Sequence, residues 1–268
     1  MRLAQEGAQI VGVDHENAKQ TLDLISAVDG SATAITCDVS EPASVAALKN
    51  AVEVNIGRCD ILMNNAGIYP AQRFDEITLR RLATRSLGQS RSMFLITKAF
   101  AGCMRQRGRG RVINIASDTV SLLVPEFVHY ITSKAGVIGF TRSIATELGA
   151  EGVTANAIAP GLTRTPGSLS RKQAGGMSND DLFALLANMQ SIKRSEEVSD
   201  LVGTVSFLAS DDAAFITGQT LYVNGGWPYA HNVKFSQRFE NRDAKASGSR
   251  RLGDFREGRP GAVLHRRR

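Results

Sequence analysis

Short apolar runs rich in β-branched residues recur along this chain and alternate with longer stretches of helical periodicity. The runs that we expect to form strands are residues 8–13, 33–39, 60–64, 111–116, 154–159 and 220–223. The stretches that we expect to form helices are residues 1–7, 16–28, 42–57, 78–107, a segment ending near 148, 180–189 and 195–209. Strands that alternate with helices are typical of a parallel sheet. The sequence therefore predicts an α/β fold with a doubly wound parallel sheet.

Polar residues follow several of these predicted strands at the point where each strand ends. They are Asp14, Asp38, Asn65, Ser117 and Thr163. Because open parallel sheets bind ligands beyond the carboxyl ends of their strands, we expect these side chains to line one cleft. Ser40 and Ser195 precede predicted helices, and we expect their side chains to cap them.

Charge divides the chain into two parts. Residues 232–268 carry 11 Lys and Arg against 4 Asp and Glu, a net of +7, whereas residues 1–231 carry 21 against 22, a net of −1. We therefore expect one domain over residues 1–231 and a basic, disordered tail over residues 232–268. A nucleic-acid-binding tail is the alternative, but the nearly neutral body argues against a nucleic-acid partner.

The sequence also suggests where the protein works. It contains no run of 18 uncharged apolar residues, so no membrane-spanning helix is expected, and its first residues lack the apolar core of a signal peptide. The three widely spaced cysteines, Cys37, Cys59 and Cys103, are expected to be reduced core thiols rather than disulfide partners or metal ligands. We therefore expect a cytoplasmic protein with no membrane association and no metal site.

Tyr130 and Lys134 lie four residues apart in a predicted helix, and Ser117 lies at the end of a predicted strand upstream. Positions i and i+4 lie on one face of a helix, so the ammonium can stand beside the phenol. A nearby positive charge lowers the pKa of an acid, and this pair therefore predicts a general acid/base. The Ser117 hydroxyl can donate a hydrogen bond to a substrate oxygen as charge develops on it. A Tyr-x-x-x-Lys pair can also arise by chance, so the surrounding motifs decide whether this pair is catalytic.

Those motifs resemble the classical short-chain dehydrogenases/reductases from about residue 3 to residue 227. In chain order they are Cys37-Asp38-Val39, Asn64-Asn65-Ala66-Gly67, Ser117, Tyr130-x-x-x-Lys134, Ala159-Pro160-Gly161 with Thr163 and Thr165, and FITGQTLYVNGG at 215–226. Each motif alone is weak, but their joint occurrence at the family's spacing is specific. The stretch GRCDILMNNAGIYP is similar to bacterial NAD-dependent alcohol and ketone dehydrogenases.

The resemblance implies the catalytic roles. Tyr130 would exchange a proton with the substrate oxygen, while Lys134 would lower the pKa of Tyr130 and hold the nicotinamide ribose. Ser117 would orient the substrate carbonyl, and hydride would pass between NAD(H) and a secondary alcohol or ketone. His129 adjoins Tyr130 but faces another side of the helix, so we expect it to be non-catalytic.

The resemblance also implies the cofactor contacts. Asp14 would bond the adenosine ribose hydroxyls and would repel a 2′-phosphate, so NAD is expected rather than NADP. The residues expected to hold the cofactor are Asp14, Asp38, Val39, Asn65, Ala66, Gly67, Tyr130, Lys134, Pro160, Gly161, Thr163 and Thr165. Residues 166–194 are expected to form the lid that selects the substrate. Family members tend to form tetramers, so a homo-oligomer, either a tetramer or a dimer, is expected.

The chain departs from the family's pattern in three places. The family opens with a strand and a Thr-Gly-x-x-x-Gly-x-Gly turn that seats the cofactor phosphates, whereas this sequence starts in the following helix. We therefore expect a chain truncated at its start, with a Rossmann-like sheet that lacks the first strand and the glycine-rich turn. Gln89 stands where the family often has an asparagine, and residues 232–268 exceed the family's usual length. The alternative to an active enzyme is an inactive remnant that cannot bind the dinucleotide.

Overall fold

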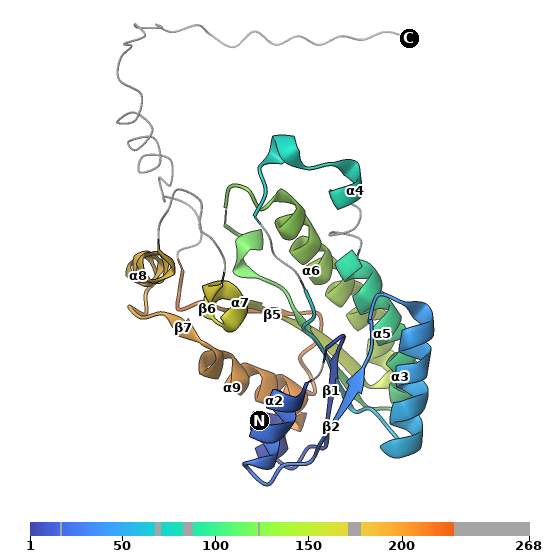
Figure 1. The fold of residues 1–268 in the computed structure, drawn as a ribbon. Helices are drawn as coiled ribbons and strands as arrows, with labels where there is room; N and C mark the ends of the chain where they lie inside the picture. The colour runs from blue at the N-terminus through green and yellow to red at the C-terminus, as the bar shows by residue number, and fades with distance from the viewer. Residues whose placement is uncertain (17, 68–70, 83–87, 123, 171–177, 228–268) are drawn as a thin grey trace, which may run out of the picture. The chain divides into compact units, whose positions relative to one another are not determined.

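The computed structural model describes residues 1–16, 18–67, 71–82, 88–122, 124–170 and 178–227 (Figure 1). Its helices are α1 (Arg2–Gln5), α2 (Lys19–Ser26), α3 (Pro42–Asn55), α4 (Leu79–Leu82), α5 (Gly88–Gln106), α6 (Val128–Leu148), α7 (Pro166–Leu169), α8 (Asn179–Met189) and α9 (Val198–Ala209). Its strands are β1 (Ile10–Asp14), β2 (Ala32–Thr36), β3 (Ile61–Asn64), β4 (Gly110–Ile115), β5 (Val153–Pro160), β6 (Thr163–Arg164), β7 (Glu196–Glu197) and β8 (Thr220–Val223). The tail predicted for residues 232–268 lies outside the described residues.

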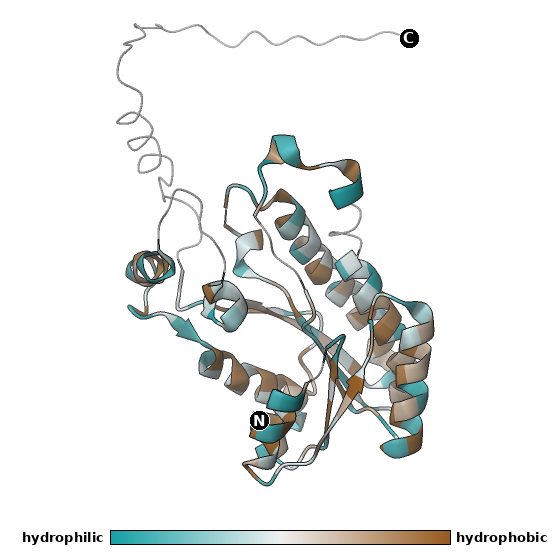
Figure 2. Cartoon of the chain, viewed as in Figure 1, coloured by the Kyte–Doolittle hydropathy of each residue, from teal (hydrophilic) through white to brown (hydrophobic). Residues whose placement is uncertain are grey.

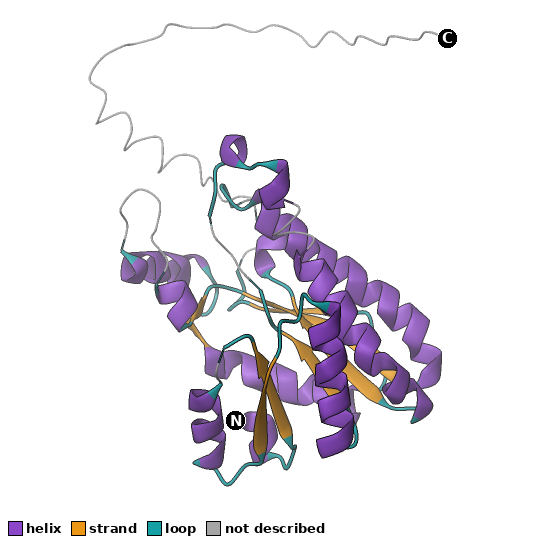
Figure 3. Ribbon diagram, turned by 45° about the vertical axis from the view of Figure 1, so that its right-hand side comes forward, coloured by secondary structure: helices purple, strands orange, loops and turns teal. Residues whose placement is uncertain are grey.

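Every strand pair in the described ranges is parallel. β1 pairs with β2, while β3, β4, β5 and β8 form a second sheet in the order β3-β4-β5-β8. The two-residue strands β6 and β7 pair separately. Helices flank the strands on both sides (Figure 3), so the predicted α/β fold with a doubly wound parallel sheet is confirmed.

The core has two layers because neighbouring residues of a strand point to opposite faces of the sheet. On β4, Val112 packs in a cluster with residues of α3, α5 and the end of α6. The next residue, Ile113, packs in a second cluster with residues of α9. Figure 2 shows hydrophobic residues along the strands. None of the helices placed by the structure is long and apolar enough to cross a membrane.

The sheet is interrupted between β1 and β3. No ladder joins these two strands within the described part of the chain, so each has one edge without a strand partner. The family resemblance predicts a sheet that lacks its first strand, and the ladder is interrupted between the β1–β2 pair and the β3-β4-β5-β8 sheet. The family resemblance, rather than any local pattern in the sequence, thus anticipated an interrupted ladder.

Three local predictions were wrong or incomplete. Ser40 does not cap α3, because its hydroxyl donates to Asp38 and the N-cap is Glu41. Ser195 does not cap α9: the N-cap is Glu197, whose side chain accepts from the backbone of Asp200, while the Asp200 carboxylate accepts from the Glu197 backbone. The helix predicted for residues 78–107 appears as α4 and α5, and residues 83–87 between them lie outside the described ranges.

Candidate active site

β4 carries Ser117 to the carboxyl-end edge of the sheet. Ser117 is buried and is the N-cap of a 3₁₀ turn over Asp118–Val120. Its Oγ accepts from the hydroxyl of Thr119 at 2.9 Å and from the Thr119 backbone N–H at 3.3 Å. Both contacts use Oγ as an acceptor, so the Ser117 hydroxyl keeps its own proton to donate to a ligand oxygen.

α6 carries Tyr130 and Lys134, one helical turn apart. The Lys134 Nζ lies 5.8 Å from the centroid of the Tyr130 ring, and the ring of Phe127 meets Tyr130 edge-on at 5.9 Å. The Lys134 ammonium also donates to the carbonyl of Ile115 at 2.7 Å, two residues before Ser117. This bond ties α6 to the end of β4, so the structure brings together the three residues predicted to be catalytic.

Lys134 is buried, with 4% of its surface exposed. Burial lowers its pKa from the usual 10.5 to about 8, because the charged ammonium loses hydration. At neutral pH the group still carries its proton and can act as a positive neighbour for Tyr130.

Gln89 lies in the same cluster. Its Oε1 accepts a hydrogen bond from Ser133 at 3.0 Å, next to Lys134 on α6. Gly67 lies against both side chains: a Cβ added there would be 3.3 Å from Gln89 Nε2 and 3.7 Å from Lys134 Nζ. The glutamine that stands where the family often has asparagine is therefore close to the lysine.

Asp14 and Asp38 follow β1 and β2. Asp14 accepts from the Glu16 backbone N–H at 3.1 Å, and this bond is the main cause that lowers its pKa. Asp38 accepts from both the hydroxyl and the backbone of Ser40, which likewise lowers its pKa. His15 contributes to both lowered pKa values, so the two exposed carboxylates lie near one another and are charged at neutral pH.

The segment after β5 is held by a residue that the sequence analysis did not assign. Glu196 is buried and accepts from the Gly161 backbone at 3.0 Å and from the Thr163 hydroxyl at 2.7 Å. Burial raises its pKa. Glu196 belongs to the run Ser195-Glu196-Glu197 before a predicted helix, and nothing in the sequence indicates that its side chain is buried.

Asp118 was also missed. It is buried, it directly follows Ser117, and it is bonded to the side chain of Asn224 after β8. Burial, and secondarily the charge of Glu196, raises the pKa of Asp118 to about 7. Asp118 and Glu196 are therefore two buried carboxyl groups, close enough for the charge of Glu196 to raise the pKa of Asp118. In the sequence, the only sign that Asp118 belongs to the site is that it directly follows Ser117.

The remaining predicted residues lie on the same loops. Asn65 and Ala66 are exposed after β3, Val39 is half-buried after β2, and Pro160 ends β5. Thr165 caps α7, its Oγ1 accepting from the Ser168 backbone at 3.1 Å. His129, predicted to be non-catalytic, is buried in α6. Part of the predicted lid, residues 171–177, lies outside the described ranges.

These positions fit the two nucleoside ends of a dinucleotide. Two charged, exposed carboxylates after β1 and β2 suit ribose hydroxyls. At the other end, Gly161 packs closely against Glu196, because a Cβ there would come within 2.7 Å of Glu196 Oε2. Between these ends, the described residues contain no glycine-rich turn that links a strand to a helix N-terminus, the usual seat for phosphates. The described residues therefore fit the two nucleoside ends of a dinucleotide but do not provide the usual seat for its pyrophosphate.

The chain is similar to known proteins over most of its length. A family model described as enoyl-(acyl carrier protein) reductase matches residues 1–228. The chain is 35% identical to the (2S)-[(R)-hydroxy(phenyl)methyl]succinyl-CoA dehydrogenase subunit BbsD of Thauera aromatica, over 84% of this chain and 89% of the relative. It is 32% identical to the 3-oxoacyl-[acyl-carrier-protein] reductase FabG of Escherichia coli K12, over 84% and 88%.

Solved structures show the same likeness. A short-chain dehydrogenase/reductase from Burkholderia xenovorans is 33% identical, with a TM-score of 0.79 over 84% of this chain and 87% of that structure. A gluconate 5-dehydrogenase from Burkholderia cenocepacia, solved with NADP and tartrate, is 30% identical, with a TM-score of 0.76 over 84% and 88%.

Proposed function

The chain belongs to the short-chain dehydrogenase/reductase family of oxidoreductases, and on that premise we propose that it interconverts a secondary alcohol and a ketone with NAD(H). The relatives named above are a reductase of oxo groups and dehydrogenases. A carbonyl or hydroxyl carbon is therefore the reacting centre that we propose for this chain. A bound nicotinamide supplies or accepts the hydride.

We assign the proton to Tyr130. Its phenol would donate a proton to the substrate oxygen during reduction and accept one during oxidation. The Lys134 ammonium, 5.8 Å from the ring centroid, favours the phenolate by its charge. The Ser117 hydroxyl would donate to the same oxygen, because its other contacts leave that proton available.

We assign the cofactor to both groups of strands. Asp14 and Asp38 would hold the adenosine end, with Val39 beside the adenine. Asn65, Ala66 and Gly67 would pass beneath it, where glycine lets the backbone approach closely. Pro160, Gly161, Thr163 and Thr165 would hold the nicotinamide end. We propose NAD over NADP because Asp14 is charged, and a carboxylate repels a 2′-phosphate.

The observation that carries this proposal is the bond from Lys134 to the Ile115 carbonyl, which joins the helix of Tyr130 to the strand of Ser117. The test is Tyr130→Phe, which removes the proton and leaves the ring. Turnover of a secondary alcohol should fall by about 10²–10⁴, with NADH binding little changed. His129→Gln serves as the control next in sequence. Equal turnover by Tyr130→Phe and the unaltered protein would refute the assignment.

A second candidate follows from the missing phosphate seat. The chain would then be an inactive member of the family that keeps the cleft but does not bind the dinucleotide. Titration of the folded protein with NADH, followed by nicotinamide fluorescence, separates the two. Binding with turnover supports the oxidoreductase, whereas a well-folded protein that leaves NADH fluorescence unchanged supports the inactive member.

We also propose a cytoplasmic homo-oligomer, a dimer or tetramer, acting on a small molecule. The assembly is proposed because members of the family tend to form tetramers. The compartment is proposed because Cys37, Cys59 and Cys103, all among the described residues, are free thiols. Light scattering coupled to size exclusion measures the assembly directly. A monomer at micromolar concentration would contradict it.

A further inference from the structure

Glu196 joins strand β7 to the turn that follows β5. In the register of the β6–β7 pair, Glu196 lies opposite Thr163. Glu196 is buried, with 6% of its surface exposed, and its side chain bonds two groups of the turn. One carboxylate oxygen, Oε1, accepts from the Thr163 hydroxyl at 2.7 Å, and the other, Oε2, accepts from the Gly161 N–H at 3.0 Å. A single side chain therefore holds both groups.

The two donors differ in what they can do. The Gly161 N–H can only donate, whereas the Thr163 hydroxyl can donate or accept. A carboxylate has no proton to give, so the hydroxyl must donate its own proton to Glu196. The distance of 2.7 Å is that of a charge-assisted hydrogen bond. Burial raises the pKa of Glu196, and the two hydrogen bonds oppose that rise because they stabilise the carboxylate.

The Thr163 oxygen is left with acceptor capacity only. A hydroxyl has one proton and two lone pairs, and here Glu196 takes the proton. Thr163 is half-buried, and neither lone pair of its Oγ1 accepts a bond from another residue that the structure describes. A ligand group that meets this oxygen must therefore donate a hydrogen bond to it.

The backbone beside Glu196 is anchored to the first turn of α9. The Glu197 N–H donates to the Asp200 carboxylate at 2.9 Å, and Asp200 pairs with Arg194 at 2.6 Å. Asp200 and Arg194 thus hold the chain on either side of β7. This anchoring keeps the Glu196 carboxylate against Thr163.

We propose that Glu196 is a positioning residue for the ring end of the dinucleotide: by taking the Thr163 proton, it makes the Thr163 oxygen an acceptor and so selects a ring substituent that carries an N–H donor. This role rests on the proposed function, in which the turn from Pro160 to Thr165 holds the nicotinamide. The NH₂ of the nicotinamide carboxamide is the donor that this oxygen would meet. Glu196 itself does not touch the ring and acts through Thr163.

The test compares NAD with 3-acetylpyridine adenine dinucleotide, in which a methyl group replaces the amide NH₂. The two dinucleotides share their phosphates and adenosine, so the ratio of their affinities reports on the ring substituent. Isothermal titration calorimetry of the full-length protein measures both affinities without turnover. We expect NAD to bind about threefold to tenfold more tightly, which is the range that one hydrogen bond supplies.

Glu196→Gln keeps the shape of the side chain but reverses the Thr163 hydroxyl. The glutamine carbonyl must face the Gly161 N–H, because that group can only donate, and the glutamine NH₂ then faces Thr163. The Thr163 oxygen accepts from the glutamine, and its proton becomes free to point toward the ligand. The preference for NAD should therefore fall to about twofold or less.

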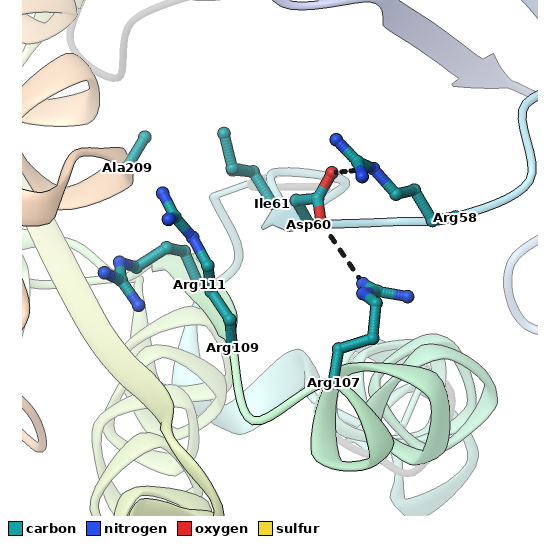
Figure 4. Close-up of a pocket in the computed structure, with 7 residues that line it drawn as sticks. All are labelled: Arg58, Asp60, Ile61, Arg107, Arg109, Arg111 and Ala209. Carbon is teal, nitrogen blue, oxygen red and sulfur yellow. Dashed lines mark hydrogen bonds and ion pairs between the residues drawn. The ribbon is translucent and has the colours of Figure 1, made fainter.

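Asp60→Asn is the matched control, because Asp60 is another carboxylate held by two donors. Asp60 lines a pocket of about 420 Å³ at the start of β3, where it pairs with Arg58 at 2.9 Å and with Arg107 at 3.3 Å (Figure 4). β3 and β5 belong to one parallel sheet, so this pocket lies at the opposite edge from the turn after β5. The same loss of charge there should leave the affinity ratio unchanged.

Variants of Thr163 show whether Glu196 acts through it. Thr163→Ser keeps the hydroxyl and should keep the preference for NAD to within about twofold. Thr163→Val keeps the shape but removes the acceptor, so the preference should fall as it does in Glu196→Gln. Adding Glu196→Gln to Thr163→Val should then change the ratio by less than about twofold.

Two results would overturn the role of Glu196 while the proposed function stands. The first is binding of both dinucleotides with the same ratio in Glu196→Gln and in the unaltered protein. The second is an equal effect of Glu196→Gln with and without the Thr163 hydroxyl, which would mean that Glu196 only supports the fold. Binding of neither dinucleotide by the folded protein would overturn the proposed function and this role together.

Discussion

Asp118 is a buried acid whose pKa lies well above its ordinary range. Its pKa is raised from 3.8 to about 7, so the folded chain holds a proton that the unfolded chain releases at about pH 4. The folded state therefore loses stability as the pH rises from about 4 to 7. Asp118→Asn should flatten this slope and raise the unfolding free energy at pH 8 by about 1–3 kcal/mol.

Thermal unfolding between pH 5 and pH 8 measures this effect. Asp212→Asn, at an exposed aspartate in a 3₁₀ turn, is the control and should leave the slope unchanged. If the slope survives in Asp118→Asn, another group holds the proton.

Asp14 is the residue on which the proposed preference for NAD depends. An aspartate is ordinarily charged at neutral pH, and the hydrogen bond from the Glu16 backbone lowers the pKa of Asp14 further. Asp14→Ala should raise the ratio of NADPH to NADH affinity by on the order of tenfold, since it removes a repulsion against a 2′-phosphate. Fluorescence titration with both nucleotides measures the ratio. Asp23→Ala on α2 is the control, and an unchanged ratio in Asp14→Ala would place the preference elsewhere.

At this scale the sequence located residues by motif but could not show what surrounds them. Ser117, Tyr130 and Lys134 were identified from type and spacing, because one helical turn separates the last two. Asp118 and Glu196 were missed because their significance comes from burial among segments distant in sequence. Propensity and periodicity carry no information about such neighbours.

At the scale of elements, the turn after β5 is closely packed. A Cβ at Gly161 would lie 2.7 Å from Glu196 Oε2 and 3.3 Å from the Asn224 Cα. Gly161→Ala should therefore cost about 1–3 kcal/mol of stability by overpacking and weaken NADH binding. Chemical denaturation and NADH titration measure the two effects.

Gly139 provides the opposite case on α6. A Cβ there meets nothing within 4 Å, so Gly139→Ala should stabilise the helix by roughly 0.5–1 kcal/mol. If Gly139→Ala destabilised the protein as Gly161→Ala does, the space beside Gly139 would not accommodate a methyl group.

The strands were predicted better than the helix caps. The strand runs 111–116 and 154–159 match β4 and β5 to within about one residue at each end, because burial on both faces leaves an uninterrupted apolar signal. The caps proposed for Ser40 and Ser195 failed because several polar residues precede each helix. Tertiary partners, such as the Asp38 carboxylate that accepts from Ser40, decide which of them caps.

At the scale of the whole molecule, the interrupted sheet predicts unfolding in stages. β3, β4, β5 and β8 share one continuous ladder, and a buried polar chain from Asn64 through Asn114 to Thr141 joins two of these strands to α6. β1 and β2 lack a ladder to that sheet. We expect the β1–β2 segment to unfold at a lower denaturant concentration.

Two probes can separate these stages. Cys37, just after β2, should become reactive to alkylation before the emission of buried Trp227 changes. Mass spectrometry assigns the modified cysteine. Coincident transitions would show that the described residues unfold as one cooperative unit.

The interruption itself was anticipated only through the family resemblance, since no local pattern marks an absent neighbour. Hydrophobic periodicity shows that a strand is apolar but not which strand lies beside it. The exposure of Val13 and Met63 became visible only in three dimensions. The boundary predicted between residues 231 and 232 lies outside the described ranges and stays a prediction.

The division of the sheet also has a consequence for cofactor choice. Asp14 and Asp38, which suit the adenosine end, stand on the β1–β2 ladder, whereas Ser117, Tyr130 and Lys134 stand on or against the β3–β8 ladder. Under the roles proposed above, substitutions at Asp14 or Asp38 would change nucleotide choice and leave the bond between Lys134 and the end of β4 in place.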